Sequence, residues 1–500
     1  METLNFLSQG FGVALMPTNL MMAAIGALIG TIVGMLPGLG PINGVALLMP
    51  LAFALKLPAH TALILLTAVY IGCEFGGRIS SILLNVPGDA GAIMTAIDGH
   101  PMARKGEAGV ALSISAWASF VGSVVSIVGI VLFAPLLARW ALAFGPAEYF
   151  ALMCFAFACI TGLMGNEPLK AVLAAAMGLA LSTVGLDSNS GVYRFTGDNV
   201  HLSDGIQFIV VVIGLFSVSE ILVMLEHQTS SSGLIRTVGR TLFNMKELVM
   251  TGWTIARSSV LGFVVGVLPG AGATIASAMA YSVEKRLNDK EGTFGKGDIR
   301  GVSAPEAANN GSAVGSFIPM LTLGVPGSGT TAVMMGALAL YNITPGPALF
   351  TQQPELVWGL IASMFVTSVL LLIINIPMVG IFARLLLVPN WLLVPGILAI
   401  SAVGVYSVHA TTFDLLLMGV LGIVGFALRK AGIPMAPLIL GFVLGDLMEQ
   451  NLRRALSITN GELSILWGSP ITVGLWLAAA AMLLLPPLYR RWQRRHAALA

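Results

Sequence analysis

A glycine–proline motif occurs twice in each half of this chain, always inside an apolar stretch. Residues 34–40 (GMLPGLG) reappear as residues 266–272 (GVLPGAG), and residues 85–89 (NVPGD) reappear as residues 324–328 (GVPGS). Proline breaks a helix and removes a backbone donor, while glycine adds conformational freedom. In lipid an unpaired backbone group costs several kcal/mol, so such breaks survive only where protein, water or a ligand satisfies them. Two pairs of broken membrane segments indicate the binding site of a transporter.

Composition places the chain in a membrane. It has 500 residues, of which 56% are hydrophobic and only 10% are charged, whereas soluble domains carry roughly 25% charged residues. Its mean hydropathy is +0.90, and its apolar stretches are long enough to cross a hydrocarbon core of ~30 Å. We therefore predict an all-α polytopic membrane protein without a soluble nucleotide domain, which excludes an ATP-driven pump. We expect no nucleic-acid partner.

The motifs recur at a nearly constant offset, which indicates an internal duplication. The first motif pair is offset by 232 residues, the second by 239, and residues 213–216 and 440–443 form a third pair offset by 227. A near-constant offset is the mark of a repeated unit. We expect a first membrane repeat at 1–226, a cytoplasmic linker at 227–251, a second repeat at 252–488 and a basic cytoplasmic tail at 489–500.

The positive charges predict that the two repeats have opposite orientations. Lysines and arginines gather in the linker, in the loop 285–300 and in the C-terminal tail, whereas the loop 187–204 holds three aspartates and one arginine. Cytoplasmic loops of membrane proteins are enriched in Lys and Arg. The first three segments are therefore expected inside and the acidic loop outside. An inverted repeat with broken or re-entrant helices is a common transporter architecture.

The breaks also predict a binding chemistry. A helix that starts just after Pro-Gly-x-Gly presents unpaired N–H groups and a positive dipole end, which together favour an anion. Small polar side chains cluster around these breaks and would suit carboxylates; the competing interpretation is that small residues only allow close helix packing. The candidate substrate-binding residues are Gly38, Gly40, Asn43, Ser80, Ser81, Asn85, Gly88, Gly270, Gly272, Thr274, Gly327, Ser328 and Thr330.

Ionisable and amide groups in apolar surroundings are candidates for an ion site. Asp89 lies inside the second break, and Asn309 and Asn310 share one helix; these three are the ion-binding candidates. Glu74 and Arg78 are one helical turn apart, so they could pair with each other, or Arg78 could meet a substrate carboxylate. Glu306 follows a proline at an expected helix start. We find no enzymatic motif, no metal-ligand spacing and no indication of a cofactor beyond a possible Na⁺.

At these residues the chain resembles a known family. Residues 34–41, 75–89, 98–106, 305–311 and 323–332 are similar to the signatures of TctA, the large membrane subunit of the bacterial tripartite tricarboxylate transporters. The resemblance covers nearly the whole chain. It implies a small four-helix membrane partner (TctB-like), a periplasmic solute-binding protein (TctC-like), and location in the lipid bilayer of the bacterial inner membrane. It also implies import of di- or tricarboxylates such as citrate, driven by a Na⁺ or H⁺ gradient.

Three other functions stay open at the level of sequence. One is the membrane subunit of another binding-protein-dependent family for C4-dicarboxylates. Another, of a different class, is an integral membrane enzyme acting on lipids, which would need a nucleophile or metal cluster near one interface. The third is a channel without coupling. The sequence does not identify the carboxylate, because recognition in such systems lies largely in the binding protein.

Overall fold

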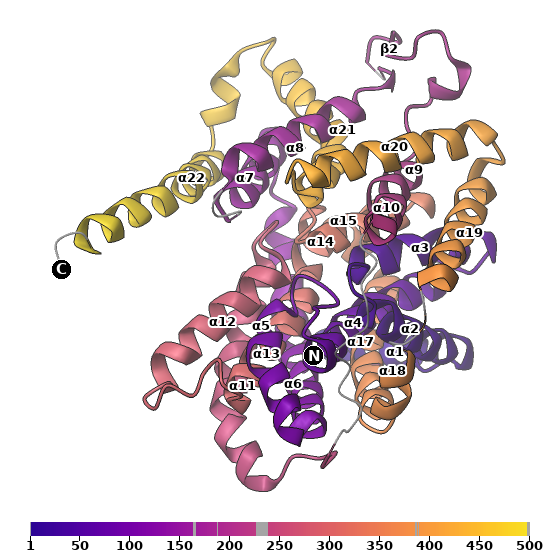
Figure 1. Ribbon diagram of the computed structural model, residues 1–500. Helices are drawn as coiled ribbons and strands as arrows, with labels where there is room; N and C mark the ends of the chain where they lie inside the picture. The colour runs from indigo at the N-terminus through magenta and orange to yellow at the C-terminus, as the bar shows by residue number, and fades with distance from the viewer. Residues whose placement is uncertain are drawn as a thin grey trace.

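The computed structural model describes residues 2–163, 167–187, 189–226, 239–385, 388 and 390–497. This part of the chain is almost entirely helical (Figure 1), and eight of its helices are long and apolar enough to cross a membrane. Five shorter apolar helices accompany them. The all-α polytopic membrane fold predicted from composition is thereby confirmed. The linker residues 227–238 and the tail residues 498–500 lie outside the described residues.

The elements of the first half run from the N-terminus to the linker. Their bounds are α1 Glu2–Ala14, α2 Pro17–Met35, α3 Gly40–Ala54, α4 Ala59–Leu84, α5 Ile93–Met102, η1 Ala103–Glu107, α6 Ala108–Ala141, α7 Pro146–Leu163, α8 Pro168–Ser182, β1 Gly185–Leu186, β2 Tyr193–Arg194, η2 Val200–Leu202, α9 Phe208–Val212, η3 Ile213–Val218 and α10 Ser219–Glu226. The two strands pair antiparallel in the loop between α8 and α9.

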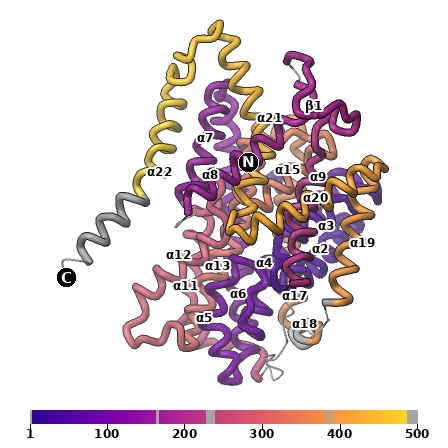
Figure 2. Tube along the Cα trace, turned by 45° about the horizontal axis from the view of Figure 1, so that its top comes forward, coloured from indigo at the N-terminus to yellow at the C-terminus, as the bar shows by residue number. Residues whose placement is uncertain are grey.

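The second half follows with a similar sequence of helices. Their bounds are α11 Met245–Val267, α12 Gly272–Asn288, α13 Ile299–Gly315, α14 Phe317–Leu323, α15 Gly329–Leu340, α16 Leu349–Gln352, α17 Pro354–Asn375, α18 Val379–Leu385, α19 Asn390–His409, α20 Thr412–Lys430, α21 Met435–Ile458, η4 Leu463–Trp467 and α22 Pro470–Ala497. In Figures 1 and 2 the C-terminal helix α22 extends away from the main body.

The first and third breaks have the same backbone geometry. Leu36 and Leu268 each precede a proline and are extended (φ −77°, ψ 119° and φ −76°, ψ 123°), because a following proline disfavours the helical region. Gly38 and Gly270 then take φ of +88° and +77°, values that L side chains rarely adopt. Helices α3 and α12 start two residues later. Each motif therefore turns a helical hairpin, α2–α3 and α11–α12.

The second and fourth breaks also match. Asn85 and Gly324 end α4 and α14 in the left-handed region, with φ of +58° and +66°, a common way for a helix to end. The Gly38 N–H donates to the carbonyl of Gly88 (3.3 Å), and the Gly270 N–H donates to the carbonyl of Gly327 (2.9 Å). In each half, therefore, one break is hydrogen-bonded to the other.

The two hairpins reach the middle of the molecule from opposite ends of α4. At the start of α4, Thr61 donates to Asn19 of α2 (2.7 Å), so the base of the α2–α3 hairpin lies there. At the other end of α4, His100 of α5 contacts the Ile82 carbonyl (3.1 Å). Tyr281, near the end of α12, donates to Asp98 of the same helix α5 (2.9 Å). The base of the α11–α12 hairpin therefore lies at that second end.

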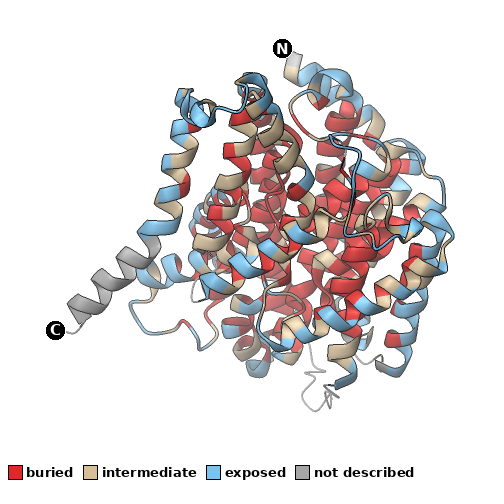
Figure 3. Ribbon diagram, turned by 90° about the horizontal axis from the view of Figure 1, so that it is seen from above, coloured by how far each residue is buried: buried red, intermediate tan, exposed pale blue. Residues whose placement is uncertain are grey.

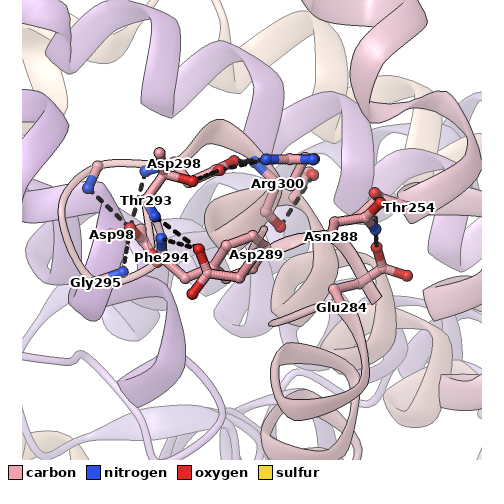
Figure 4. A network of polar contacts seen from close by, with 12 residues as sticks. Asp98, Thr254, Glu284, Asn288, Asp289, Thr293, Phe294, Gly295, Asp298 and Arg300 are labelled. Atoms are coloured by element: carbon pink, nitrogen blue, oxygen red, sulfur yellow. Dashed lines mark hydrogen bonds and ion pairs between the residues drawn. The ribbon is translucent and has the colours of Figure 1, made fainter. Parts of the chain in front are cut away.

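Asp98 ties the loop between α12 and α13 to α5. Its carboxylate is fully buried and accepts the N–H groups of Gly295 (2.8 Å), Gly297 (2.8 Å) and Asp298 (2.9 Å), as well as the Tyr281 hydroxyl. Figure 4 shows Asp98 beside Gly295 and Asp298, with Glu284 and Thr254 nearby. Arg257 and Thr254 of α11 both bond to Glu284 of α12. A first-half helix thus anchors a second-half loop.

The loop 183–207 is anchored to α21. Arg194 pairs with Glu449 (2.9 Å), and Arg453 pairs with Asp187 (3.3 Å). Buried residues concentrate in the middle of the molecule, whereas exposed ones cover its periphery (Figure 3). The largest buried apolar cluster joins α3, α4, α9, η3, α15, α17 and α21, so the two halves share one core.

Prolines and glycines also interrupt helices away from the four breaks. Helix α17 ends at Asn375 and α18 begins at Val379, after Pro377. Helices α5, η1 and α6 follow one another directly, with a kink at Gly106 (φ +86°). One expectation from the sequence is wrong. Pro305 does not start a helix, because α13 begins at Ile299 and carries Pro305 in its interior.

Candidate functional site

A cavity of 1280 Å³ lies where the four breaks meet. Its lining includes three or more residues from each hairpin tip, the segment 87–91 at the second break and the segment 328–330 at the end of the fourth. Ligand sites are typically clefts of about 300–1,000 Å³, so the space is large enough for a small organic anion and its water. Ten of the sixteen site candidates line it: Gly38, Gly40, Asn43, Gly88, Asp89, Gly270, Gly272, Thr274, Ser328 and Thr330.

The starts of several helices point their first turns at this cavity. The first residues of α3 and α12, Gly40 and Gly272, line it, and within the described part of the chain no side chain caps either start. The first N–H groups of a helix have no partner inside the helix. Helix α15 also starts there, with Ser328 and Thr331 forming a capping box. The positive ends of these helix dipoles make the cavity favourable for negative charge.

Hydroxyl and amide side chains face the same space. The Tyr70 hydroxyl lies 3.2 Å from the Ser328 hydroxyl and 3.3 Å from that of Ser316, so a first-half helix contacts the fourth break. Asn43 donates to the Leu39 carbonyl and accepts from Ser217 (3.4 Å), which holds its side chain in the first turn of α3. Thr274 and Thr330 add hydroxyl groups from the second half. Together these groups form a donor-rich wall.

The open end of the cavity carries charges that sequence reasoning missed. Arg429 and Lys430, at the end of α20, line it and pair with Glu220 and Glu226 of α10. The Lys430, Glu226 and Glu167 side chains are 50%, 39% and 58% exposed, which marks the opening. These residues lie at helix ends remote from the β1–β2 loop. Only the tertiary fold brings them to the breaks, so no local signal in the sequence identifies them.

Glu220 also explains why a glycine is needed at the first break. A Cβ atom on Gly38 would lie 2.2 Å from a Glu220 carboxylate oxygen. The second oxygen of Glu220 binds Arg429, whose guanidinium lies 6.0 Å from the centre of the Phe216 ring. The tip of the α2–α3 hairpin therefore contacts a buried ion pair of the opposite wall. A side chain at position 38 would displace that pair.

An acidic group lies at the inner end of the cavity. Glu74 is 3% exposed and accepts from the amide of Asn309 (2.9 Å), and its carboxyl group interacts with that of Asp89. Asp89 also accepts the Ala92 N–H (2.8 Å). Both carboxyl groups line the cavity. Of the ion-binding candidates, Asp89 and Asn309 therefore meet at one place, and Glu74 joins them.

Arg78 makes neither of the contacts considered from sequence. Its guanidinium is 1% exposed and donates to Ser119 (3.3 Å) and to Asn375 (3.2 Å). Ser119 donates in turn to Glu306 (2.9 Å), which also accepts from Thr95 (2.6 Å). Arg78 therefore belongs to a buried network and is not among the residues that line the cavity.

Six of the candidates lie outside the cavity lining. Ser80 and Ser81 donate to the Gly77 carbonyl within α4 (3.3 and 2.9 Å). Asn85 is an exposed helix cap, and Gly327 supports the third break through its carbonyl. Asn310 bonds to the Glu306 carbonyl within α13 (3.2 Å), while Asn309 reaches the site indirectly through Glu74.

Comparisons with known proteins give the family. The model of the tripartite tricarboxylate transporter TctA family matches residues 20–440. A protein of Agrobacterium vitis described as an uncharacterized 52.8 kDa protein in the TAR-I ttuC' 3'region is 40% identical over 491 residues, which is 98% of this chain and 97% of that protein. A second, described as an uncharacterized protein in the TAR-II ttuC' 3'region, is 44% identical over 230 residues, or 45% of this chain and 95% of that protein.

No solved structure matches the chain. The family match spans all four breaks, the Tyr70 and Asn309 contacts and the charged opening of the cavity. A match over most of the sequence, together with a relative that covers almost its whole length, is sufficient to assign the family. This chain belongs to the TctA family of tripartite tricarboxylate transporters.

Proposed function

We propose that this chain imports di- or tricarboxylates such as citrate through the cavity between its four breaks. The observation that carries the proposal is the convergence of the uncapped starts of α3 and α12 on one cavity, beside the hydroxyl groups of Tyr70, Ser328 and Thr330. Helix N-termini attract anions, and hydroxyl groups orient them by hydrogen bonds. A carboxylate is a planar anion that accepts several such bonds at once.

The route of transport follows from the two hairpins. Gly38 and Gly270 turn them at the cavity, and their bases lie at opposite ends of α4. This arrangement supports the interpretation that 1–226 and 252–488 are two inverted repeats around a central site. The charged opening lies at the ends of α10 and α20, remote from the β1–β2 loop. Because the acidic loop 187–204 is expected outside and the basic linker after α10 is expected inside, this opening would face the cytoplasm.

The partners and the location belong to the same proposal. As a family member the chain would work with a small TctB-like membrane subunit and a periplasmic TctC-like binding protein in the bacterial inner membrane. We propose that a Na⁺ or H⁺ gradient drives uptake and that the protein is a transporter subunit and not an enzyme. The proposal also excludes ATP as the energy source for uptake.

Reconstitution tests the function. The chain is co-reconstituted into proteoliposomes with its membrane partner and supplied with the binding protein and radiolabelled citrate or succinate. We expect uptake that needs an imposed Na⁺ or H⁺ gradient and the binding protein, with no uptake of a neutral sugar. Flux that persists without any gradient would indicate a channel, and absence of carboxylate uptake under every gradient would contradict the proposal.

A further inference from the structure

Two carboxyl groups lie close together inside the protein, and in the part of the chain that the structure describes no basic side chain pairs with either of them. Glu74 is 3% exposed. The Asp89 carboxylate lies against Gly77, three residues further along the same helix α4, where a Cβ atom would be 2.9 Å from it. Removing charge from water is expensive unless the charge is paired, and two adjacent carboxylates cannot both stay ionised without a counterion. The pair therefore requires a proton or a bound cation.

The nearby arginine does not supply that balance. Arg78 is 1% exposed and is joined to Glu306 through Ser119, so these two opposite charges compensate each other. The remaining titratable groups around Glu74 are Asp89 of the second break, Tyr70 and Cys73 of α4 and Glu306 of α13. None of these adds a positive charge. The uncompensated charge stays with Glu74 and Asp89.

Asn309 provides a second, independent sign of a ligand. Its side chain is fully buried, and its amide nitrogen donates to Glu74 (2.9 Å). Its amide oxygen has no hydrogen-bond partner among the described residues and lies against Gly91, where a Cβ atom would be 2.1 Å away. A buried amide oxygen beside two carboxylates supplies the hard oxygen ligands that small cations prefer. Asp89 and Gly91 both line the cavity, so a cation can reach the group.

The second half places a neutral group at the equivalent positions. With the offset of 239 residues between the second and fourth breaks, Glu74 corresponds to Ala313 and Asp89 to Ser328. Asn309 corresponds by the same offset to Tyr70, and each of these two side chains reaches across to the break of the other half. The contact at the second break is therefore acidic, whereas the equivalent contact at the fourth break is made of hydroxyl groups.

We propose that the two halves have specialised: Glu74, Asp89 and Asn309 hold one monovalent coupling cation, and Tyr70, Ser328 and Thr330 hold a carboxylate of the solute. This inference rests on the proposed function for the identity of the solute. It assigns the cation to the first-half break and the anion to the second-half break. The two bound charges then lie in one cavity, where each favours binding of the other.

Cation binding is measured on the purified chain in detergent, without transport. Radiolabelled Na⁺ is added in choline chloride, and proton uptake is followed with a pH indicator in Na⁺-free buffer. We expect one of these two ions to bind, and we expect Glu74→Gln and Asp89→Asn to weaken that binding about 10-fold or more, as loss of metal-site groups commonly does. Asp89→Glu, which keeps the charge, retains binding and so separates loss of the site from misfolding.

The surface variant Glu462→Gln is the matched control, because Glu462 is an exposed carboxylate remote from the cavity. Tyr70→Phe is expected to weaken citrate binding while its cation affinity stays within about twofold of the unchanged chain. The inference is overturned if the unchanged chain binds neither Na⁺ nor a proton, or if Glu74→Gln and Asp89→Asn bind the same ion as tightly as the unchanged chain does. Because this assay needs no uptake, its failure leaves the reconstitution result standing, and the reverse also holds.

Discussion

At the residue scale, Gly38 and Gly270 show how single glycines permit the two hairpins to turn. Both adopt a positive φ, and both lie against a side chain of the facing wall: a Cβ atom would be 2.2 Å from Glu220 at the first position and 2.0 Å from Ile160 at the second. Gly272 also has a positive φ, but no atom lies within 4 Å of its Cβ position. A side chain at Gly38 or Gly270 would therefore suffer both backbone strain and a steric clash, whereas a side chain at Gly272 would suffer backbone strain alone.

Gly38→Ala is expected to destabilise the protein and to lower uptake. The left-handed conformation costs an L residue roughly 1–2 kcal/mol, and the contact with Glu220 adds to that cost. Gly272→Ala should show the smaller effect. The thermal unfolding midpoint in detergent and citrate uptake in proteoliposomes measure both. Gly252→Ala, on an exposed helix position with open space around it, is the control, and its midpoint should equal or slightly exceed that of the unchanged chain because alanine favours a helix more than glycine does. Equal midpoints for Gly38→Ala and this control would refute the prediction.

The ion pair between Arg429 and Glu220 leads to a second residue-scale prediction. The Glu220 side chain is 6% exposed, so Arg429→Gln leaves a buried carboxylate without its partner, which typically costs about 3–5 kcal/mol. The double variant with Glu220→Gln removes both charges and should regain much of the lost stability. A double-variant cycle of unfolding midpoints measures the coupling. Lys430→Gln, whose pair is far more exposed, should change little; additive effects of the two Arg429 and Glu220 substitutions would contradict this account.

At the element scale, much of the architecture could be predicted from local chemistry. Pro37 and Pro269 force the preceding leucines out of the helical region, so breaks at 34–40 and 266–272 follow from the sequence itself, whereas the choice between a broken span and a hairpin turn came from the structure. Orientation around a helix is harder to predict: Ser80 and Ser81 were expected at the site, yet both bond back to the Gly77 carbonyl. Tyr70 and Arg429 could not be found at all, because only tertiary packing carries them to the breaks.

The loop between α12 and α13 depends on one buried carboxylate of another element. Asp98→Asn removes the charge that accepts three backbone N–H groups and the Tyr281 hydroxyl, and hydrogen bonds to a charged group are worth about 1.5–3 kcal/mol each. We expect faster trypsin cleavage at Lys290 and Lys296 in this loop, with the rest of the fold intact. Asp446→Asn, whose carboxylate accepts from Gln450 within α21 and accepts no backbone N–H of the loop, serves as control. Cleavage at the same rate in both variants would disprove the anchoring role.

At the scale of the whole molecule, two hairpins from opposite ends of α4 and two further breaks enclose one cavity. The halves place chemically different groups at matching positions, with carboxylates at the second break and hydroxyl groups at the fourth. Such a division lets one cavity hold an anion and a cation together, which is the physical requirement for coupling the uptake of one to the gradient of the other. The apolar core that the two halves share holds the four breaks in fixed positions around the cavity.

The most direct test of the account is whether a carboxylate occupies this cavity. Ala273, which lines the cavity in the first turn of α12 and supplies no polar side chain, is replaced by cysteine in a chain whose Cys73, Cys154 and Cys159 are replaced by alanine. The rate of maleimide labelling is then measured with Na⁺ and with saturating citrate, and Ser464→Cys on the surface is the control. The account predicts that citrate slows labelling at position 273 several-fold and leaves position 464 unchanged, while sucrose protects neither. Equal labelling of position 273 with and without citrate would contradict it.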